Sequence, residues 1–274
     1  MKPNRLRLGR YTTVIVFGVI IAIPLFYLLS GSLMSAQEIV QYPPRLLPST
    51  PVWDNFVKAM EYLEPRTILN TFVFVLGVLV IQLVICLPAG FALSKIPFRG
   101  AAIVLAVFVV PMFMPTNLLL IPTYVVTFKL GLVGSFWGMI LPVAGQASLG
   151  VLLFRQFFAT LPPGLIDAGR IDGANWFQIF TRISLPLAKP IIASYSVVTF
   201  LTAWNMYIWP LLAAPGEDTK VLTLALAPLA SGQFAYIPPS VTFAAAVIGM
   251  LPVLVVFVVF QKWFTKGVAG SGLE

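Results

Sequence analysis

Six long runs of apolar residues constrain what this chain can fold into. They cover residues 11–33, 69–94, 100–126, 136–158, 191–214 and 240–264. A helix needs about 20 apolar residues to cross about 30 Å of hydrocarbon, and every run is long enough. The runs are continuous rather than alternating, which favours helices over the strands of a membrane barrel. The sequence therefore predicts an all-α membrane protein with six transmembrane helices in a single domain over residues 1–274.

Composition agrees with a membrane location and excludes several kinds of chemistry. Only 9% of the 274 residues are charged and the mean hydropathy is +0.97, whereas soluble domains carry about 25% charged residues. The chain has no His and one Cys, Cys86. This excludes histidine-based catalysis, an intrachain disulfide and a cysteine-rich metal site. We expect Cys86 to be a small packing residue.

The distribution of charge predicts the orientation in the membrane. Twelve of the 17 Lys and Arg residues lie at the two ends of the chain, in the turn at 95–99 and in the segment 155–189. Cytoplasmic loops carry the excess of Lys and Arg, so these parts, including the N-terminal residues 1–10, are predicted to be cytoplasmic. The net charge of +8 is then a consequence of topology and indicates no nucleic-acid partner.

Several motifs are missing from the sequence. No Asp, Glu, Lys or Arg lies in the middle of an apolar run, although ion-coupled carriers usually keep such residues at depth. The chain also lacks the GxxxxGK[ST] phosphate-binding loop and the HExxH and GxSxG motifs. We therefore expect a non-catalytic subunit, with no cofactor of its own.

Uncharged polar and aromatic residues within the apolar runs are candidates for a solute pathway. They are Asn117, Gln146, Trp204, Asn205 and Tyr207. Amides can hydrogen-bond hydroxyl groups, and an aromatic face can stack on a sugar ring, so the set suits a neutral, hydroxylated solute. The alternative for each residue is a hydrogen bond between helices.

The segment 161–190 is a polar block between two apolar runs. Its composition predicts two short helices, at 164–171 and 174–184, with Pro162-Pro163 starting the first. We expect Asp172 to cap the second helix and Gly173 to provide the turn.

The second of these helices carries an apolar stripe. Its residues are Trp176, Phe177, Ile179, Phe180 and Ile183. We expect Pro186 and Pro190 to end it. The stripe must pack either on the membrane domain of the chain itself or on a partner.

This segment resembles a known family. Asp167-Ala168-Gly169-x-x-Asp172-Gly173-Ala174, followed by Phe177, Phe180 and Leu185-Pro186-Leu187, is similar to the EAA loop of importer-type ABC transporter permeases. The sequence motifs that follow the loop in this family are also similar to Ala203-Trp204-Asn205 and Trp209-Pro210-Leu211 of this chain. The resemblance is to the MalG-like carbohydrate-uptake subfamily of binding-protein-dependent importers.

The resemblance implies that the loop docks on a cytoplasmic ATPase subunit and transmits its movement. The positions implied for coupling are Asp167, Ala168, Gly169, Asp172, Gly173, Ala174, Phe177 and Phe180. Two positions depart from the family pattern, since Asp167 replaces a Glu and Gly169 replaces an Ala. The C-terminal ending, residues 271–274, departs as well.

The implied partners are a second homologous permease, an ATPase dimer that binds ATP and Mg, an extracytoplasmic solute-binding protein and the lipid bilayer. The loops at 34–68 and 215–239 are the expected docking surface for the binding protein. The implied location is the inner membrane of a bacterium or archaeon.

The expected solute is a sugar or oligosaccharide. The alternative in the same family is glycerol-3-phosphate or a glycerophosphodiester, and the alternative in another class is a membrane scaffold or receptor subunit that transports nothing.

Overall fold

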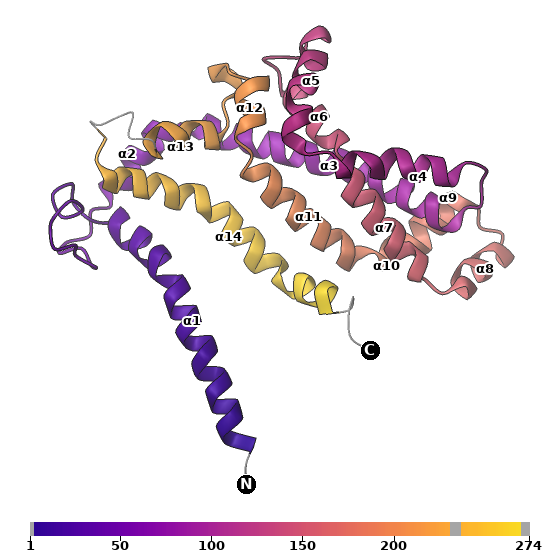
Figure 1. The fold of residues 1–274 in the computed structure, drawn as a ribbon, viewed down its shortest axis with the longest axis horizontal. Helices are drawn as coiled ribbons and strands as arrows, with labels where there is room; N and C mark the ends of the chain where they lie inside the picture. The colour runs from indigo at the N-terminus through magenta and orange to yellow at the C-terminus, as the bar shows by residue number, and fades with distance from the viewer. Residues whose placement is uncertain (1–2, 231–236, 270–274) are drawn as a thin grey trace. The chain divides into compact units, whose positions relative to one another are not determined.

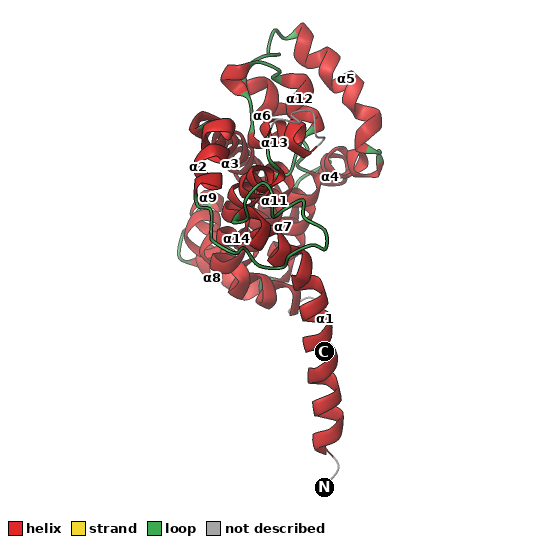
Figure 2. Cartoon of the chain, turned by 90° about the vertical axis from the view of Figure 1, so that its left-hand side faces the viewer, coloured by secondary structure: helices red, strands yellow, loops and turns green. Residues whose placement is uncertain are grey.

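All the regular secondary structure is helical in the residues that the computed structural model describes, 3–230 and 237–269 (Figures 1 and 2). The helices are α1 Pro3–Ser32, α2 Asp54–Leu63, α3 Pro65–Lys95, α4 Ala101–Val109, α5 Thr116–Lys129, α6 Phe136–Gly145, α7 Ser148–Thr160, α8 Pro163–Ile171, α9 Trp176–Gln178, α10 Leu185–Leu187, α11 Lys189–Trp204, α12 Ile208–Ala213, α13 Leu222–Ala230 and α14 Pro239–Ala269. Short 3-10 helices cover Val110–Phe113 and Glu217–Thr219, and a π-helix covers Ile179–Ser184. The predicted all-α class is confirmed for these residues, and the ending at 271–274 lies outside them.

Three helices in the described part of the chain are long and apolar enough to cross a membrane unbroken: Tyr11–Ser32, Pro65–Lys95 and Pro239–Lys262. Three further candidates are pairs of helices bent at a break, so up to six spans are present if each pair counts as one. The bent pairs are Ala101–Phe113 with Asn117–Lys129, Phe136–Gly145 with Ser148–Thr160, and Trp176–Leu187 with Lys189–Trp204.

Proline explains the break within 100–126. Pro115 disfavours a helical conformation in the residue before it, and Met114 is extended, with φ −89° and ψ 130°. The helices on either side, Ala101–Phe113 and Asn117–Lys129, meet at 113°. The apolar run continues through this point, but the helix is interrupted there.

Two further breaks within the apolar runs lie at Gln146–Ala147 and at 205–207, whereas the third bent pair, α10 and α11, meets at Ala188. The first separates α6 from α7, which are bent by 46°. The second separates α11 from α12, and Pro210 follows it. Pro210 lacks an N–H group, which frees the carbonyl four residues earlier, and the hydroxyl of Thr223 donates a hydrogen bond of 2.8 Å to that carbonyl of Met206.

The chain divides into two compact units, of which the first comprises residues 1–66 and 225–252. In this unit the amide of Asn55 on α2 donates to the carbonyls of Ser32 (2.9 Å) and Met34 (2.8 Å) at the end of α1. In the loop that follows α1, hydrogen bonding by the Ser49 side chain and by the backbone N–H groups of Ser35 and Ser49 lowers the pKa of Glu38 from 4.5 to about 2. The carboxylate of Glu38 thus joins Ser35 and Ser49, which lie on opposite sides of this loop.

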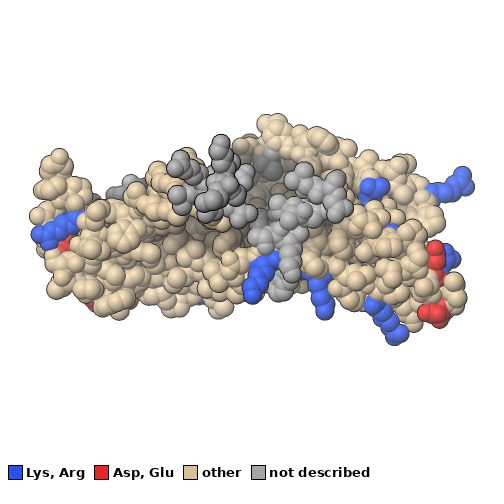
Figure 3. All heavy atoms as spheres, turned by 90° about the horizontal axis from the view of Figure 1, so that it is seen from below, with Lys and Arg blue, Asp and Glu red and all other residues tan. Residues whose placement is uncertain are grey.

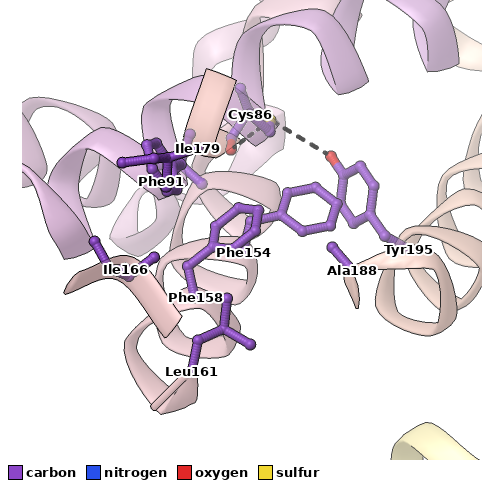
Figure 4. Close-up of a cluster of buried hydrophobic side chains, with 11 residues drawn as sticks. Cys86, Phe91, Phe154, Phe158, Leu161, Ile166, Ile179, Ala188 and Tyr195 are labelled. Carbon is purple, nitrogen blue, oxygen red and sulfur yellow. Dashed lines mark hydrogen bonds between the residues drawn. The ribbon is translucent and has the colours of Figure 1, made fainter. Parts of the chain in front are cut away.

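The second unit comprises residues 67–224 and 253–274 and contains a dense hydrophobic core. Figure 4 shows this core, in which α3, α7 and α11 converge on Phe154 and Tyr195. Gly150 allows the close approach, because a Cβ atom there would lie 2.5 Å from the Tyr195 hydroxyl and 2.7 Å from the Cys86 sulfur. Cys86 is fully buried in this core, which confirms its predicted packing role.

The outer surface of the helices is apolar. Large apolar side chains are more than half exposed along α1, including Tyr11, Val14 and Phe17, and the face shown in Figure 3 carries few charged groups. Contiguous apolar surface of this kind needs an apolar environment. Lipid supplies it around helices that cross a bilayer.

Candidate functional site

The turn between the two short helices of the segment 161–190 has a defined hydrogen-bonding pattern. Gly173 adopts a left-handed conformation with φ +80°. The N–H of Ala174 donates to the carbonyl of Gly169 (2.9 Å), and the N–H of Gly173 donates to that of Arg170 (3.1 Å). These two bonds form a Schellman motif, in which carbonyls near the C-terminus of α8 accept hydrogen bonds from the turn and end the helix. The prediction of a turn at Gly173 is therefore confirmed.

The cap of the second helix is Asn175, and the expectation that Asp172 caps it is wrong. The side chain of Asn175 accepts a hydrogen bond from the N–H of Gln178, and the side chain of Gln178 accepts one from the N–H of Asn175, each at 2.9 Å. Asp172 instead is the C-terminal cap residue of α8. The Asn-x-x-Gln spacing is a capping box and could have been read from the sequence.

The second helix begins two residues later and ends three residues later than the predicted range of 174–184. It runs as α9, the π-helix and α10 from Trp176 to Leu187, and it meets α11 at a bend of 74°. A π-helix widens the backbone for one turn, here immediately before Pro186, whose ring would otherwise crowd the carbonyl four residues earlier. The helix is thereby joined almost directly to α11.

The apolar stripe of this helix packs on the membrane domain of its own chain. Ile179 is fully buried, and Phe180 and Trp176 pack beside it against Phe91 of α3 and Phe158 of α7. The ring centroids of Phe91 and Phe180 lie 5.2 Å apart and those of Phe91 and Phe158 5.6 Å apart, distances at which aromatic pairs attract. The segment is therefore anchored by its inner face.

The opposite face of the segment is exposed and mixed in character. The side chains of Ile171 and Phe177 are 86% and 72% exposed, and the carboxylates of Asp167 and Asp172 are also exposed. Two large apolar groups beside two carboxylates offer a partner both apolar contact and charge. Of the predicted coupling residues, Phe177 lies on this face, whereas Phe180 belongs to the internal packing.

Gly169 has a packing role that the sequence did not show. A Cβ atom at this position would lie 2.8 Å from the Cδ1 atom of Ile183 on the facing helix. The glycine at this position thus brings α8 close to the second helix. Ala168 beside it is exposed.

Four of the predicted solute-pathway residues lie at three of the breaks between helices. Gln146 is the C-terminal cap residue of α6, Asn117 lies at the start of α5, and Asn205 and Tyr207 lie between α11 and α12. All four are exposed. The structure thus brings Asn205 and Tyr207 together and places Gln146 and Asn117 at two other breaks.

Trp204 does not offer a stacking surface. It is 4% exposed, and its ring stacks on Phe200 at 5.3 Å and meets the edge of Phe72 at 5.1 Å. The expectation that it faces a sugar is therefore not met in this conformation. The physical reason is that Phe200 and Phe72 pack against the indole within the protein.

A buried polar network in the second unit was missed by the sequence reasoning. The hydroxyl of Tyr195 on α11 donates to the Oε1 atom of Gln82 on α3 (2.8 Å). The Nε2 atom of Gln82 donates to the carbonyl of Val143 (3.1 Å), beside the α6–α7 break. A glutamine within an apolar run was the signal available, but nothing in the sequence indicated its partners.

The structure thus combines apolar helices interrupted by breaks with a segment that is packed on its inner face and exposed on its outer face. Residues 85–270 match the family described as the binding-protein-dependent transport system inner membrane component. The chain belongs to this family, which places it in the inner membrane as a multi-pass, non-catalytic transport subunit.

Relatives and solved structures agree with the family. The sn-glycerol-3-phosphate transport system permease protein UgpE of Rhizobium meliloti (strain 1021) is 32% identical over 263 residues, covering 92% of this chain and 93% of the relative. The fold is similar to a chain of a bacterial ABC transporter involved in the import of the acidic polysaccharide alginate, with a TM-score of 0.83, 24% identity and 96% and 98% of the two chains covered. A chain of the alginate transporter in complex with an alginate pentasaccharide-bound periplasmic protein gives a TM-score of 0.65, 18% identity and coverage of 98% and 96%.

Proposed function

We propose that this chain is one half of the membrane pore of an ATP-driven importer and that the segment 161–190 couples it to an ATPase. The observation that carries the proposal is the two-faced packing of the segment. Its inner face is fixed to α3 and α7 through Phe91 and Phe158, and its outer face exposes Phe177 and Asp167. A partner that binds the outer face can then move the membrane domain through the inner one.

The proposed topology has six spans, with each bent pair counted as one, and both termini in the cytoplasm. The excess of Lys and Arg on the side of the segment 161–190 supports this orientation. A second permease, an ATPase dimer that holds ATP and Mg, and an extracytoplasmic binding protein complete the proposed complex. The similarity to an alginate transporter that binds a periplasmic protein supports the last of these partners.

We propose that the solute is a small polyhydroxylated molecule, with sn-glycerol-3-phosphate as the first candidate. The name of the Rhizobium relative, which matches over nine-tenths of both chains, supports it. The second candidate is a neutral sugar, which is favoured by the exposed amides of Gln146 and Asn205. No Lys or Arg lies in the middle of an apolar run, so the second permease would supply the positive charge that a phosphate needs.

The test is solute-stimulated ATP hydrolysis by the whole complex in proteoliposomes, with its own binding protein. We expect sn-glycerol-3-phosphate to stimulate hydrolysis and to be taken up, and glycerol to do neither. Stimulation by neutral sugars alone would replace the first candidate with the second. A complex that neither hydrolyses ATP in response to any loaded binding protein nor moves solute would refute the importer and favour a scaffold.

A further inference from the structure

The side chain of Gln82 lies at the centre of the buried network and uses both ends of its amide. It is 6% exposed. Its Nε2 atom donates to the carbonyls of Val143 (3.1 Å) and Gln146 (3.4 Å). Its Oε1 atom accepts from the hydroxyls of Tyr195 (2.8 Å) and Thr199 (3.3 Å). One side chain on α3 thus joins the α6–α7 break to α11.

The break explains why an amide is present at this depth. Interrupting a helix leaves carbonyl groups without their usual N–H partners, and hydrocarbon contains no water to replace them. A buried polar group left unpaired destabilises the folded protein. The carbonyl of Val143 keeps one backbone hydrogen bond, from the N–H of Gln146 (3.1 Å), and the amide of Gln82 donates to it as well as to the carbonyl of Gln146. The hydroxyls of Tyr195 and Thr199 on α11 fix which way the amide points.

We propose that Gln82 is a positioning residue for transport: it holds the α6–α7 break in place and so determines where the side chain of Gln146 faces the solute pathway. Gln146 is exposed, but its carbonyl is one of the two that Gln82 binds. The backbone on which the candidate solute contact stands is therefore fixed from behind by α3. This inference rests on the proposed function as a permease.

The chain contains its own reporter of this arrangement. Cys86 lies one turn after Gln82 on α3, is the single cysteine of the sequence and is fully buried. Its sulfur lies 3.5 Å from the carbonyl of Ala147, which belongs to the break, and 4.0 Å from the Tyr195 hydroxyl (Figure 4). If the break moves away from α3, the thiol of Cys86 becomes accessible.

The first experiment measures the rate at which a maleimide labels Cys86 in the reconstituted complex without solute. We expect Gln82→Leu to raise the rate about tenfold, because the break then loses its hydrogen bonds to α3 and opens more often. Tyr195→Phe removes one hydroxyl that orients the amide, so it should raise the rate less. Tyr11→Phe, the same change at a position 67% exposed on α1, is the matched control and should leave the rate unchanged. A rate for Gln82→Leu equal to that of the wild type would overturn the inference.

The second experiment separates positioning from general stability. We expect Gln82→Leu to shift the ratio of uptake between sn-glycerol-3-phosphate and a neutral sugar in the same direction as Gln146→Ala. The double variant should shift it no further than the larger single change, because the two residues act through one arrangement. Additive shifts, or lowered uptake without any shift, would overturn the inference. A wild-type complex that moves neither solute would refute the proposed function instead, since labelling of Cys86 is read without solute.

Discussion

Gly173→Val tests whether the turn of the segment 161–190 transmits movement. The backbone at Gly173 has φ +80°, and a Cβ atom added there meets nothing within 4 Å. The cost of a side chain is therefore one of conformation alone, about 1–2 kcal/mol for an ordinary residue and more for a β-branched one. That cost lowers the population of the native turn about 5- to 30-fold.

The assay is binding-protein-stimulated ATP hydrolysis in proteoliposomes, with insertion of the spans checked separately. We expect Gly173→Val to abolish the stimulation and Gly173→Asn to keep part of it, because Asn visits the left-handed region more readily. Gly164→Val is the matched control, since Gly164 lies in α8 and its added Cβ also meets nothing within 4 Å. Normal stimulation by the Gly173→Val complex, or equal damage by Gly164→Val, would refute the role of the turn.

Four further changes test other parts of the chain. Asn175→Ala removes one half of the capping box and should destabilise the second helix by about 1 kcal/mol, seen as faster proteolysis of the segment in detergent. Phe158→Ala leaves a cavity beside Phe91 and should cost about 3 kcal/mol, measured as a lower melting temperature of the purified complex. Hydrogen bonding lowers the pKa of Glu38 from 4.5 to about 2, so its stabilisation of the loop at 33–52 is complete above pH 4.5 and is lost as the pH falls through 2. Pepsin should therefore cut this loop faster at pH 2 than at pH 4. In the Glu38→Gln variant the loop should be cut faster than in the wild type at pH 4 and remain susceptible at pH 2. Asn205→Ala should change the solute profile or the rate of uptake, and an unchanged profile and rate would make Asn205 a packing residue.

The sequence predicted the features that follow from local chemistry. Apolar length predicted where helices lie, and Gly173 predicted a turn because few other residues adopt a left-handed backbone. The breaks at Pro115 and before Pro210 were also within reach, since proline disturbs a helix wherever it stands. The number of apolar residues could not show that a break divides one span into two helices. A bilayer accommodates both a continuous and an interrupted helix, provided that other groups hydrogen-bond the backbone at the break.

The features that the sequence did not predict depend on partners far away in the chain. Tyr195 and Gln82 are 113 positions apart, so their hydrogen bond has no local pattern. The burial of Trp204 likewise depends on Phe72, a residue of another helix. The helix cap, in contrast, depends on local sequence. Asp172 and Asn175 can both cap a helix, and Gln178, three residues after Asn175, completes a capping box only with Asn175.

The joint between the second helix of the segment and α11 bears on how the segment can act. Only Ala188, which is fully buried, separates α10 from α11. Ile179, the first residue of the π-helix before α10, is also buried in the core. A flexible loop would absorb a displacement of the Gly173 turn within its own length. A helix that is packed along its inner face and continues directly into a span cannot do so without moving its neighbours, since close-packed side chains resist local deformation. We therefore expect any partner that displaces the turn to displace α11 with it.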